Sequence, residues 1–204
     1  LVWACMLTAV AAAGCGGEAP ASGSRYEDLA ALFADWRAFQ RPAVADGVPD
    51  YTEATMAAQY RALAGMRRRL DRIDTRGWPV NEQVDWHLVR AEMNGLDFDH
   101  RVLRPWANNP AFYATFFPSQ SDQPAREGPL AFGAVELWSH AFPLSADSAA
   151  AIDVGVRTIP ALLRQAKGNL VGNGRDLWTF GIGSIREQAA DLEQFAARLG
   201  GEHT

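Results

Sequence analysis

The stretch YTEATMAAQYRALAGMRRRLDRID, residues 51–74, carries the clearest repeating pattern in the chain. Its large apolar side chains recur every three or four residues, which places them along one face of an α-helix. They are Met56, Tyr60, Leu63, Met66, Leu70 and Ile73. Asp50 and Glu53 have the spacing of a capping box, so the pattern predicts a helix that begins at this pair and buries one face.

The same helical spacing recurs before and after this stretch. Four more helices are expected: one that ends at Arg41-Pro42, one from about 81 to 103, one from about 145 to 170, and one from the turn at 172–174 to Leu199. Asn81 is expected to cap the second of these, and Pro160 to kink or split the third. No alternating apolar run bounded by turns appears, so no significant sheet is expected. The sequence therefore predicts a mainly α fold, an antiparallel bundle-like array of helices with a long Pro- and aromatic-rich loop.

The composition and net charge of the chain indicate which classes of partner it can bind. The chain has 204 residues, of which 48% are hydrophobic and 21% charged, as in ordinary globular proteins. Its net charge is −5, and its main basic run, Arg67–Arg69, is followed at once by Asp71. An acidic chain without a basic patch is not expected to bind nucleic acid.

The first residues have the features of an export signal. Leu1–Ala13 is apolar and uncharged, too short to span a bilayer but long enough for the apolar part of a signal peptide. Small residues then precede Cys15, as in the lipobox of bacterial lipoproteins, although Ala12 stands where leucine is usual. We therefore expect Cys15 to be lipidated, and the alternative is a core cysteine in an ordinary helix.

This interpretation divides the chain into three parts. Residues 1–14 are the signal peptide, 15–25 a flexible tether rich in small residues, and 26–204 the helical domain. Cys5 falls in the part that is removed, so the mature domain has no thiol chemistry. The lipid would anchor the protein to a membrane in the bacterial cell envelope.

Two polar groupings are candidates for chemistry. Glu136 and His140 have the i, i+4 spacing that puts two metal ligands on one helical face, but chance spacing explains the pair as well. Asp97, Asp99 and His100 are candidates for acid–base work, with a surface ion network as the alternative. No recognised catalytic or metal-binding motif accompanies them, so no catalytic or metal-ligating residue is assigned.

Longer phrases give a family resemblance. The chain reads FQRPAVADGVPDYT at 39–52, DWHLVRAEMNGLDFDHRVLRPWANNPAFY at 85–113, SDQPAREGP at 121–129 and IPALLRQAKGNLVGNGRDLW at 159–178. These phrases resemble the bacterial family called domain of unknown function 885, over about residues 26–200. The resemblance implies a helical, exported and often lipidated protein whose C-terminal half carries a zinc motif of a metallopeptidase-like hydrolase. That motif is not found here, and a start methionine and a basic n-region are missing at the front. We therefore expect the chain to be clipped at both ends and zinc to belong to a full-length parent.

Within that resemblance, the loop at 104–118 becomes a candidate wall of a substrate cleft. Its aromatic residues are Trp106, Phe112, Tyr113, Phe116 and Phe117. Hydrophobic packing under a long loop is the alternative. The leading hypothesis is the N-terminal region of an envelope-anchored hydrolase, inactive alone, whose parent acts on a peptide or another small substrate. The other hypothesis is a non-catalytic lipoprotein that serves as a binding or scaffold module.

Overall fold

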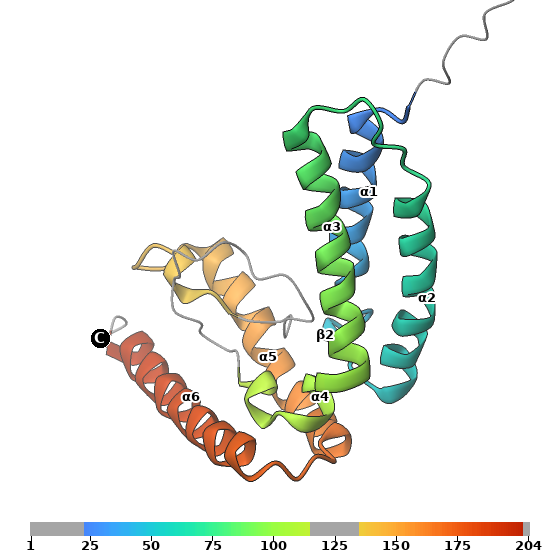
Figure 1. Cartoon of the computed structure of the whole chain (residues 1–204). Helices are drawn as coiled ribbons and strands as arrows, with labels where there is room; N and C mark the ends of the chain where they lie inside the picture. The colour runs from blue at the N-terminus through green and yellow to red at the C-terminus, as the bar shows by residue number, and fades with distance from the viewer. Residues whose placement is uncertain (1–22, 115–134, 202–204) are drawn as a thin grey trace, which may run out of the picture.

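The computed structural model describes residues 23–114 and 135–201 and confirms a mainly α fold (Figure 1). The elements are α1 (Tyr26–Phe39), β1 (Val44–Ala45), β2 (Val48–Pro49), α2 (Glu53–Asp71), α3 (Val80–Phe98), η1 (Asp99–Leu103), α4 (Pro105–Asn108), η2 (Pro110–Tyr113), η3 (Leu137–Ser139), α5 (Ala146–Asn169) and α6 (Arg175–Gly201). Within the described residues, the strands form only one short antiparallel hairpin, β1–β2. Cys15, the predicted signal peptide, Phe116 and Phe117 lie outside the described residues.

Helices α1, α2 and α3 lie side by side as a bundle with its own core (Figure 1). The core contains Leu29, Leu32, Trp36, Leu63, Met66, Leu70, Val89, Met93 and Leu96. The indole N–H of Trp36, which is completely buried, donates a hydrogen bond of 2.7 Å to Glu92. Burial of each large apolar side chain contributes about 1.5–3 kcal/mol, so this core stabilises the bundle.

A second core lies where α4, η2 and α5 meet the start of α2. It contains Tyr51, Met56, Trp106, Ala107, Phe112, Tyr113, Ile159, Leu162 and Ala166. The apolar face predicted at residues 51–74 is therefore divided: Met56 belongs to this core, whereas Leu63, Met66 and Leu70 belong to the bundle. Helix α2 links the two halves of the molecule in this way.

Polar side chains of α5 form hydrogen bonds with Tyr51, in the segment that joins the β-hairpin to α2. The Asn169 amide donates to the Tyr51 carbonyl oxygen at 2.8 Å and to the Tyr113 hydroxyl at 3.0 Å. The Tyr113 hydroxyl in turn donates to the Trp106 carbonyl oxygen at 2.7 Å. Gln165 accepts from the Tyr51 backbone N–H at 2.7 Å. Buried polar groups are thus paired across segments that lie far apart in the sequence.

The observed helices differ from the predicted ones at the start of α2, at the start of α3 and at Pro160. Helix α2 begins at Glu53, because the Asp50 carboxylate accepts from the Thr52 backbone N–H at 2.9 Å and the Thr55 hydroxyl at 2.6 Å, forming a turn before the helix. Helix α3 begins at Val80, so Asn81 lies inside the helix and does not cap it. Helix α5 is not split at Pro160 but continues through it to Asn169.

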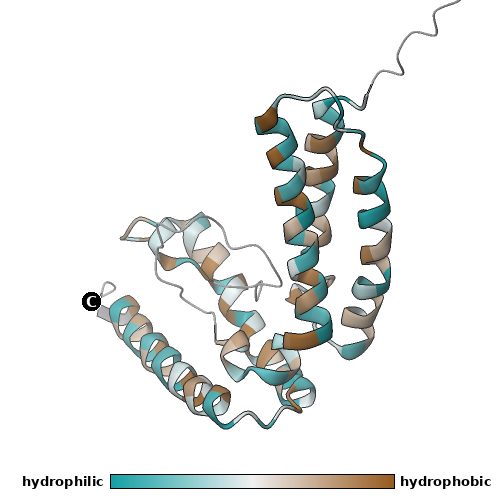
Figure 2. Ribbon diagram, in the orientation of Figure 1, coloured by the Kyte–Doolittle hydropathy of each residue, from teal (hydrophilic) through white to brown (hydrophobic). Residues whose placement is uncertain are grey.

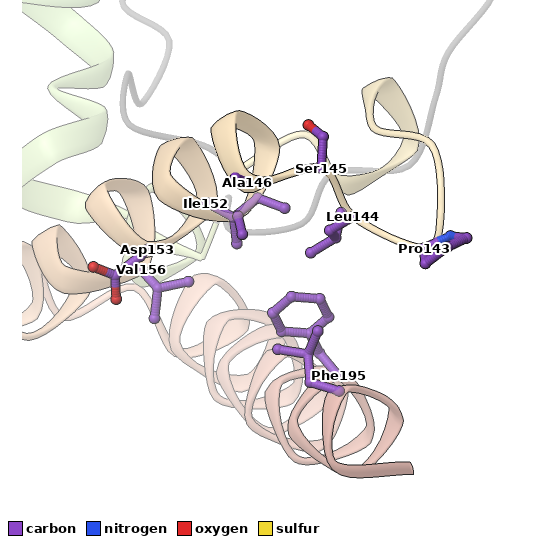
Figure 3. Close-up of a pocket in the computed structure, with 10 residues that line it drawn as sticks. Pro143, Leu144, Ser145, Ala146, Ile152, Asp153, Val156 and Phe195 are labelled. Carbon is purple, nitrogen blue, oxygen red and sulfur yellow. The ribbon is translucent and has the colours of Figure 1, made fainter. Parts of the chain in front are cut away.

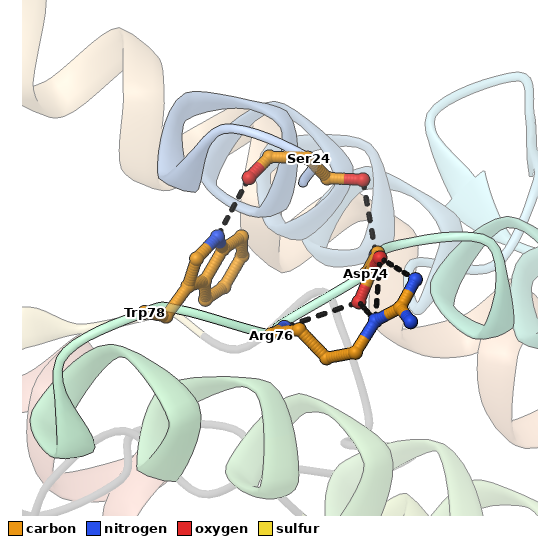
Figure 4. Close-up of polar contacts among 4 residues, drawn as sticks. All are labelled: Ser24, Asp74, Arg76 and Trp78. Atoms are coloured by element: carbon orange, nitrogen blue, oxygen red, sulfur yellow. Dashed lines mark hydrogen bonds and ion pairs between the residues drawn. The ribbon is translucent and has the colours of Figure 1, made fainter. Parts of the chain in front are cut away.

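The chain enters the bundle through contacts to the turn between α2 and α3 (Figure 4). The Ser24 carbonyl oxygen accepts from the Trp78 indole N–H at 2.6 Å, and the Ser24 hydroxyl accepts from the Asp74 backbone N–H at 3.0 Å. The hydrogen bonds from Arg76 hold the pKa of the Asp74 carboxyl at about 2. The end of the predicted tether is therefore attached at this end of the bundle, at the top of Figure 1.

Candidate functional site

Two cavities lie between α5 and α6. Figure 2 shows apolar and polar residues alternating along α6, as expected of a helix with one apolar face. This face packs mainly against η2 rather than directly against α5. Gly181 permits the contact, because a Cβ atom at this position would lie 2.6 Å from the Cβ of Pro110. The η2 turn therefore lies between the two long helices, and the residues that the structure describes leave two cavities there.

One cavity, here called the proximal cavity, lies beside the turn that joins α5 to α6. Its volume is about 510 Å³, within the range of small-molecule sites. Its apolar walls include Leu163 and Leu170 of α5, Ile182 and Ile185 of α6, and Pro110 and Tyr113 of η2. A site of this size and composition suits an apolar ligand or the apolar part of a larger one.

Two cationic residues also line the proximal cavity. Lys167 lies in the last turn of α5 and Arg186 lies on α6, so they come from opposite walls. Both residues are exposed, and no Asp or Glu is among the residues that line the cavity. Trp178 lies at the same cavity, and its indole N–H donates to the Gly172 carbonyl oxygen at 2.7 Å.

A second cavity, here called the distal cavity, lies at the other end of the two helices (Figure 3). Its volume is about 490 Å³. Phe195 points from α6 across the space toward Ile152 and Val156 of α5 (Figure 3). Asp153 lines this cavity as well, and its carboxylate accepts from the Arg157 guanidinium at 2.7 Å. The distal cavity thus has a charged residue on its wall whose charge is already paired.

The predicted acid–base cluster at 97–100 is divided by the fold. Asp97 forms ion pairs with Arg101 at 2.8 Å and with Arg67 at 3.6 Å. Burial raises the pKa of the Asp97 carboxyl, but the Arg101 hydrogen bond and the Arg67 charge outweigh it, so the pKa lies below its usual value. Asp97 therefore belongs to an ion network of the kind that the sequence left open.

His100 lies apart from that network, in the interior. Its ring stacks on Tyr60 at 5.3 Å between centroids and approaches Trp106 at 4.8 Å. Its Nε2 lies 3.0 Å from the side-chain oxygen of Gln59, whose amide donates to the Phe39 carbonyl oxygen at 3.0 Å. Since that oxygen can only accept, Nε2 carries the proton and donates it. Burial lowers the pKa of His100, and the Asp97 charge opposes the shift.

The candidate cleft-wall residues lie mainly in the second core. Trp106, Phe112 and Tyr113 are all buried, and burial raises the pKa of the Tyr113 hydroxyl to about 12. Of these three, Tyr113 also lines the proximal cavity. Packing accounts for Trp106 and Phe112, while Tyr113 takes part in both the core and the cavity. Phe116 is outside the described residues.

The candidate pair Glu136 and His140 does not lie on one helix. A short 3₁₀ turn, η3, separates the two residues, and His140 has an extended backbone, so they do not share a face of an α-helix. Across residues 23–114 and 135–201, no three His, Cys, Asp or Glu side chains gather closely enough to hold a metal ion. In the same ranges, no helix has both the length and the apolar content of a membrane span.

The residues that distinguish the two cavities were not singled out in the sequence. Lys167 and Arg186 belong to no motif, and their relation depends on how α5 and α6 pack. The apolar positions Ile185, Leu192, Phe195 and Leu199 do follow a helical stripe in the sequence. Such a stripe predicts a buried face, but it does not reveal that Ile185, Phe195 and Leu199 line cavities.

No family model, no curated protein and no solved structure matches this chain.

Proposed function

We propose that this chain is a binding module of a lipid-anchored envelope protein, and that the groove between α5 and α6 is its ligand site. The observation that carries the proposal is the pair of apolar cavities, about 510 and 490 Å³, between these helices. Cavities of this volume bury most of the surface of a small ligand. Part of the apolar face of α6 would thereby be available to a ligand, while Leu192 packs against the second core.

Binding of a neutral apolar fluorophore tests this function. N-phenyl-1-naphthylamine is uncharged and fluoresces more strongly in an apolar site, so titration should give a saturable rise. Ile182→Glu places a charge on the wall of the proximal cavity and should weaken binding at least tenfold. The matched control is Phe180→Glu on the same helix, since Phe180 is 67% exposed and lines neither cavity.

The two variants separate a ligand site from general surface adhesion. The control should bind the fluorophore as the unaltered protein does, and both variants should keep the helical circular dichroism spectrum. Equal affinity in both variants would contradict a binding site in the proximal cavity, and a rise that never saturates would contradict a binding site anywhere in the groove.

The membrane anchor in this proposal rests on the sequence around Cys15. The attachment of Ser24 at the top of the bundle in Figure 1 supports a compatible orientation, because the α5–α6 turn lies at the opposite end of the molecule. A lipid anchor at the N-terminus would then leave the proximal cavity facing away from the membrane. A fatty-acid analogue should label the protein in cells and fail to label Cys15→Ser.

The hydrolase function stays a proposal supported by the resemblance alone. In it, this chain would supply helical walls around a substrate, while zinc and its ligands would belong to the full-length parent. Metal analysis and peptide hydrolysis by the product of the complete reading frame test it. A complete product that binds no zinc would leave the binding module as the better hypothesis.

A further inference from the structure

The proximal cavity has an uneven distribution of charge. Its apolar walls carry two cations, Lys167 on α5 and Arg186 on α6, and no anion is among its lining residues. The distal cavity differs, because Asp153 lines it and is paired with Arg157. The two ends of the groove are therefore suited to different ligand groups, although their volumes are similar.

The two cations have no carboxylate partner among the residues that the structure describes. Ion pairs in those residues involve Arg25, Arg67, Arg69, Arg76, Arg101 and Arg157 instead. The chain as a whole is acidic, with 24 Asp and Glu against 19 Lys and Arg. Two cations without a carboxylate partner beside an apolar cavity are therefore not a consequence of a generally basic surface.

The side chains of Lys167 and Arg186 can line the cavity with their apolar stems and place their charged ends at its opening. Lysine and arginine have apolar stems, which pack along apolar walls while their charged ends stay in water. Lys167 and Arg186 line the cavity and are exposed, as this arrangement requires. Since they lie on opposite walls, an anion at the mouth would meet a cation from each helix.

We infer that the proximal cavity binds a single-chain anionic amphiphile, a free alkyl carboxylate. Its alkyl chain would lie against Leu163, Ile182 and Ile185, and its carboxylate would lie between Lys167 and Arg186. Charge complementarity favours an anionic head group, and the absence of an acidic lining residue disfavours a cationic one. This inference rests on the proposed function, since it names the ligand class of the same groove.

Calorimetric titration with three ligands of equal chain length tests the head group. Dodecanoate and dodecyltrimethylammonium are added below the concentration at which micelles form, and dodecanol is added below its solubility limit. We expect dodecanoate to bind most tightly and the cationic ligand most weakly. Shortening the carboxylate should weaken binding roughly fourfold for each methylene group removed. Added salt should weaken binding of dodecanoate and leave that of dodecanol nearly unchanged.

Variants then assign the charge effect to residues. Lys167→Ala and Arg186→Ala should each lower dodecanoate affinity about three- to tenfold, between the effects of an exposed ion pair and a charged hydrogen bond. Dodecanol affinity should fall much less, because an uncharged head group loses only contacts with the apolar stems. The matched control is Arg164→Ala, an exposed cation on α5 that does not line the cavity, and its dodecanoate affinity should match that of the unaltered protein.

The outcomes distinguish this inference from the function on which it rests. If N-phenyl-1-naphthylamine and dodecanol bind but dodecanoate has no advantage, the groove is a binding site and the anionic ligand class is wrong. The inference is also overturned if a variant that combines Lys167→Ala and Arg186→Ala binds dodecanoate as tightly as the unaltered protein. If none of these ligands binds, both the proposed function and the inference fail.

Discussion

At the scale of single residues, His100 has an environment that the chain around it does not suggest. The segment DFDHR is strongly polar, yet His100 is 9% exposed and lies between the rings of Tyr60 and Trp106. Because η1 is a π-helical turn at the end of α3, the histidine is directed differently from Asp97 and Arg101. The sequence offers the ion network at Asp97 as one alternative, but the burial of His100 depends on Tyr60 of α2 and Trp106 of α4, which pack against its ring.

The environment of His100 predicts that stability depends on pH. Burial lowers its pKa in the folded state, whereas an unfolded histidine titrates near 6.5. The unfolded chain therefore binds more protons as the pH falls below about 6.5, and stability contributed by neutral His100 is lost from there toward its folded pKa. The free energy of unfolding, measured by urea denaturation, should fall between pH 7 and pH 5.

Two variants assign this slope to His100. His100→Phe keeps an aromatic ring beside Tyr60 and Trp106 but leaves the Gln59 oxygen without its donor, so it should be less stable by about 1–3 kcal/mol. Its stability should nevertheless change less between pH 7 and pH 5. His87→Gln removes an exposed histidine and should keep the original slope. An unchanged slope in His100→Phe would show that other groups cause the pH dependence.

At the scale of elements, the positions of the helices were largely predictable from the sequence. The spacing of large apolar residues gives the same answer as the structure for α1, α2, α3, α5 and α6, within a few residues at their ends. The ends depend on side-chain hydrogen bonds, as at Asp50, which periodicity does not reveal. The groove was not predictable, because the same apolar stripe on α6 suits a core and a half-covered wall equally well.

Two glycines of α6 offer a matched test of how this helix packs. Gly183 has open space where a Cβ atom would lie, so Gly183→Ala should raise stability by about 0.5–1 kcal/mol through helix propensity. At Gly181 the new Cβ would lie 2.6 Å from the Pro110 Cβ and 2.9 Å from the Ala111 nitrogen. Gly181→Ala should therefore lower stability, by about 1–3 kcal/mol, although the substitution is identical.

Thermal unfolding followed by circular dichroism measures this difference. The two midpoints should move in opposite directions from that of the unaltered protein. If Gly181→Ala is as stabilising as Gly183→Ala, then η2 does not pack closely on α6, and the shape of both cavities would have to be revised.

At the scale of the whole molecule, stability is distributed unevenly. Helices α2, α3 and α5 each place several buried side chains in a core. Helix α6 contributes none over residues 175–199, where Gly181 is its buried position and Leu192 packs against the second core only in part. Segments with few buried contacts open locally at low cost. We therefore expect α6, which forms one wall of the groove, to be the least stable long helix among the described residues.

Native-state hydrogen exchange tests this distribution. Amides at 183–199 should exchange faster than those in the middle of α2 and α3, because opening α6 exposes little buried surface. Equal protection of α6 and α3 would contradict the uneven distribution. A ligand that binds only the closed groove stabilises it by RT ln(1 + [L]/Kd), so dodecanol at about 100 times its Kd should slow exchange in α6 roughly hundredfold. The amides of the α1–α3 core should slow much less when they exchange without opening of the groove, which would locate the ligand between α5 and α6.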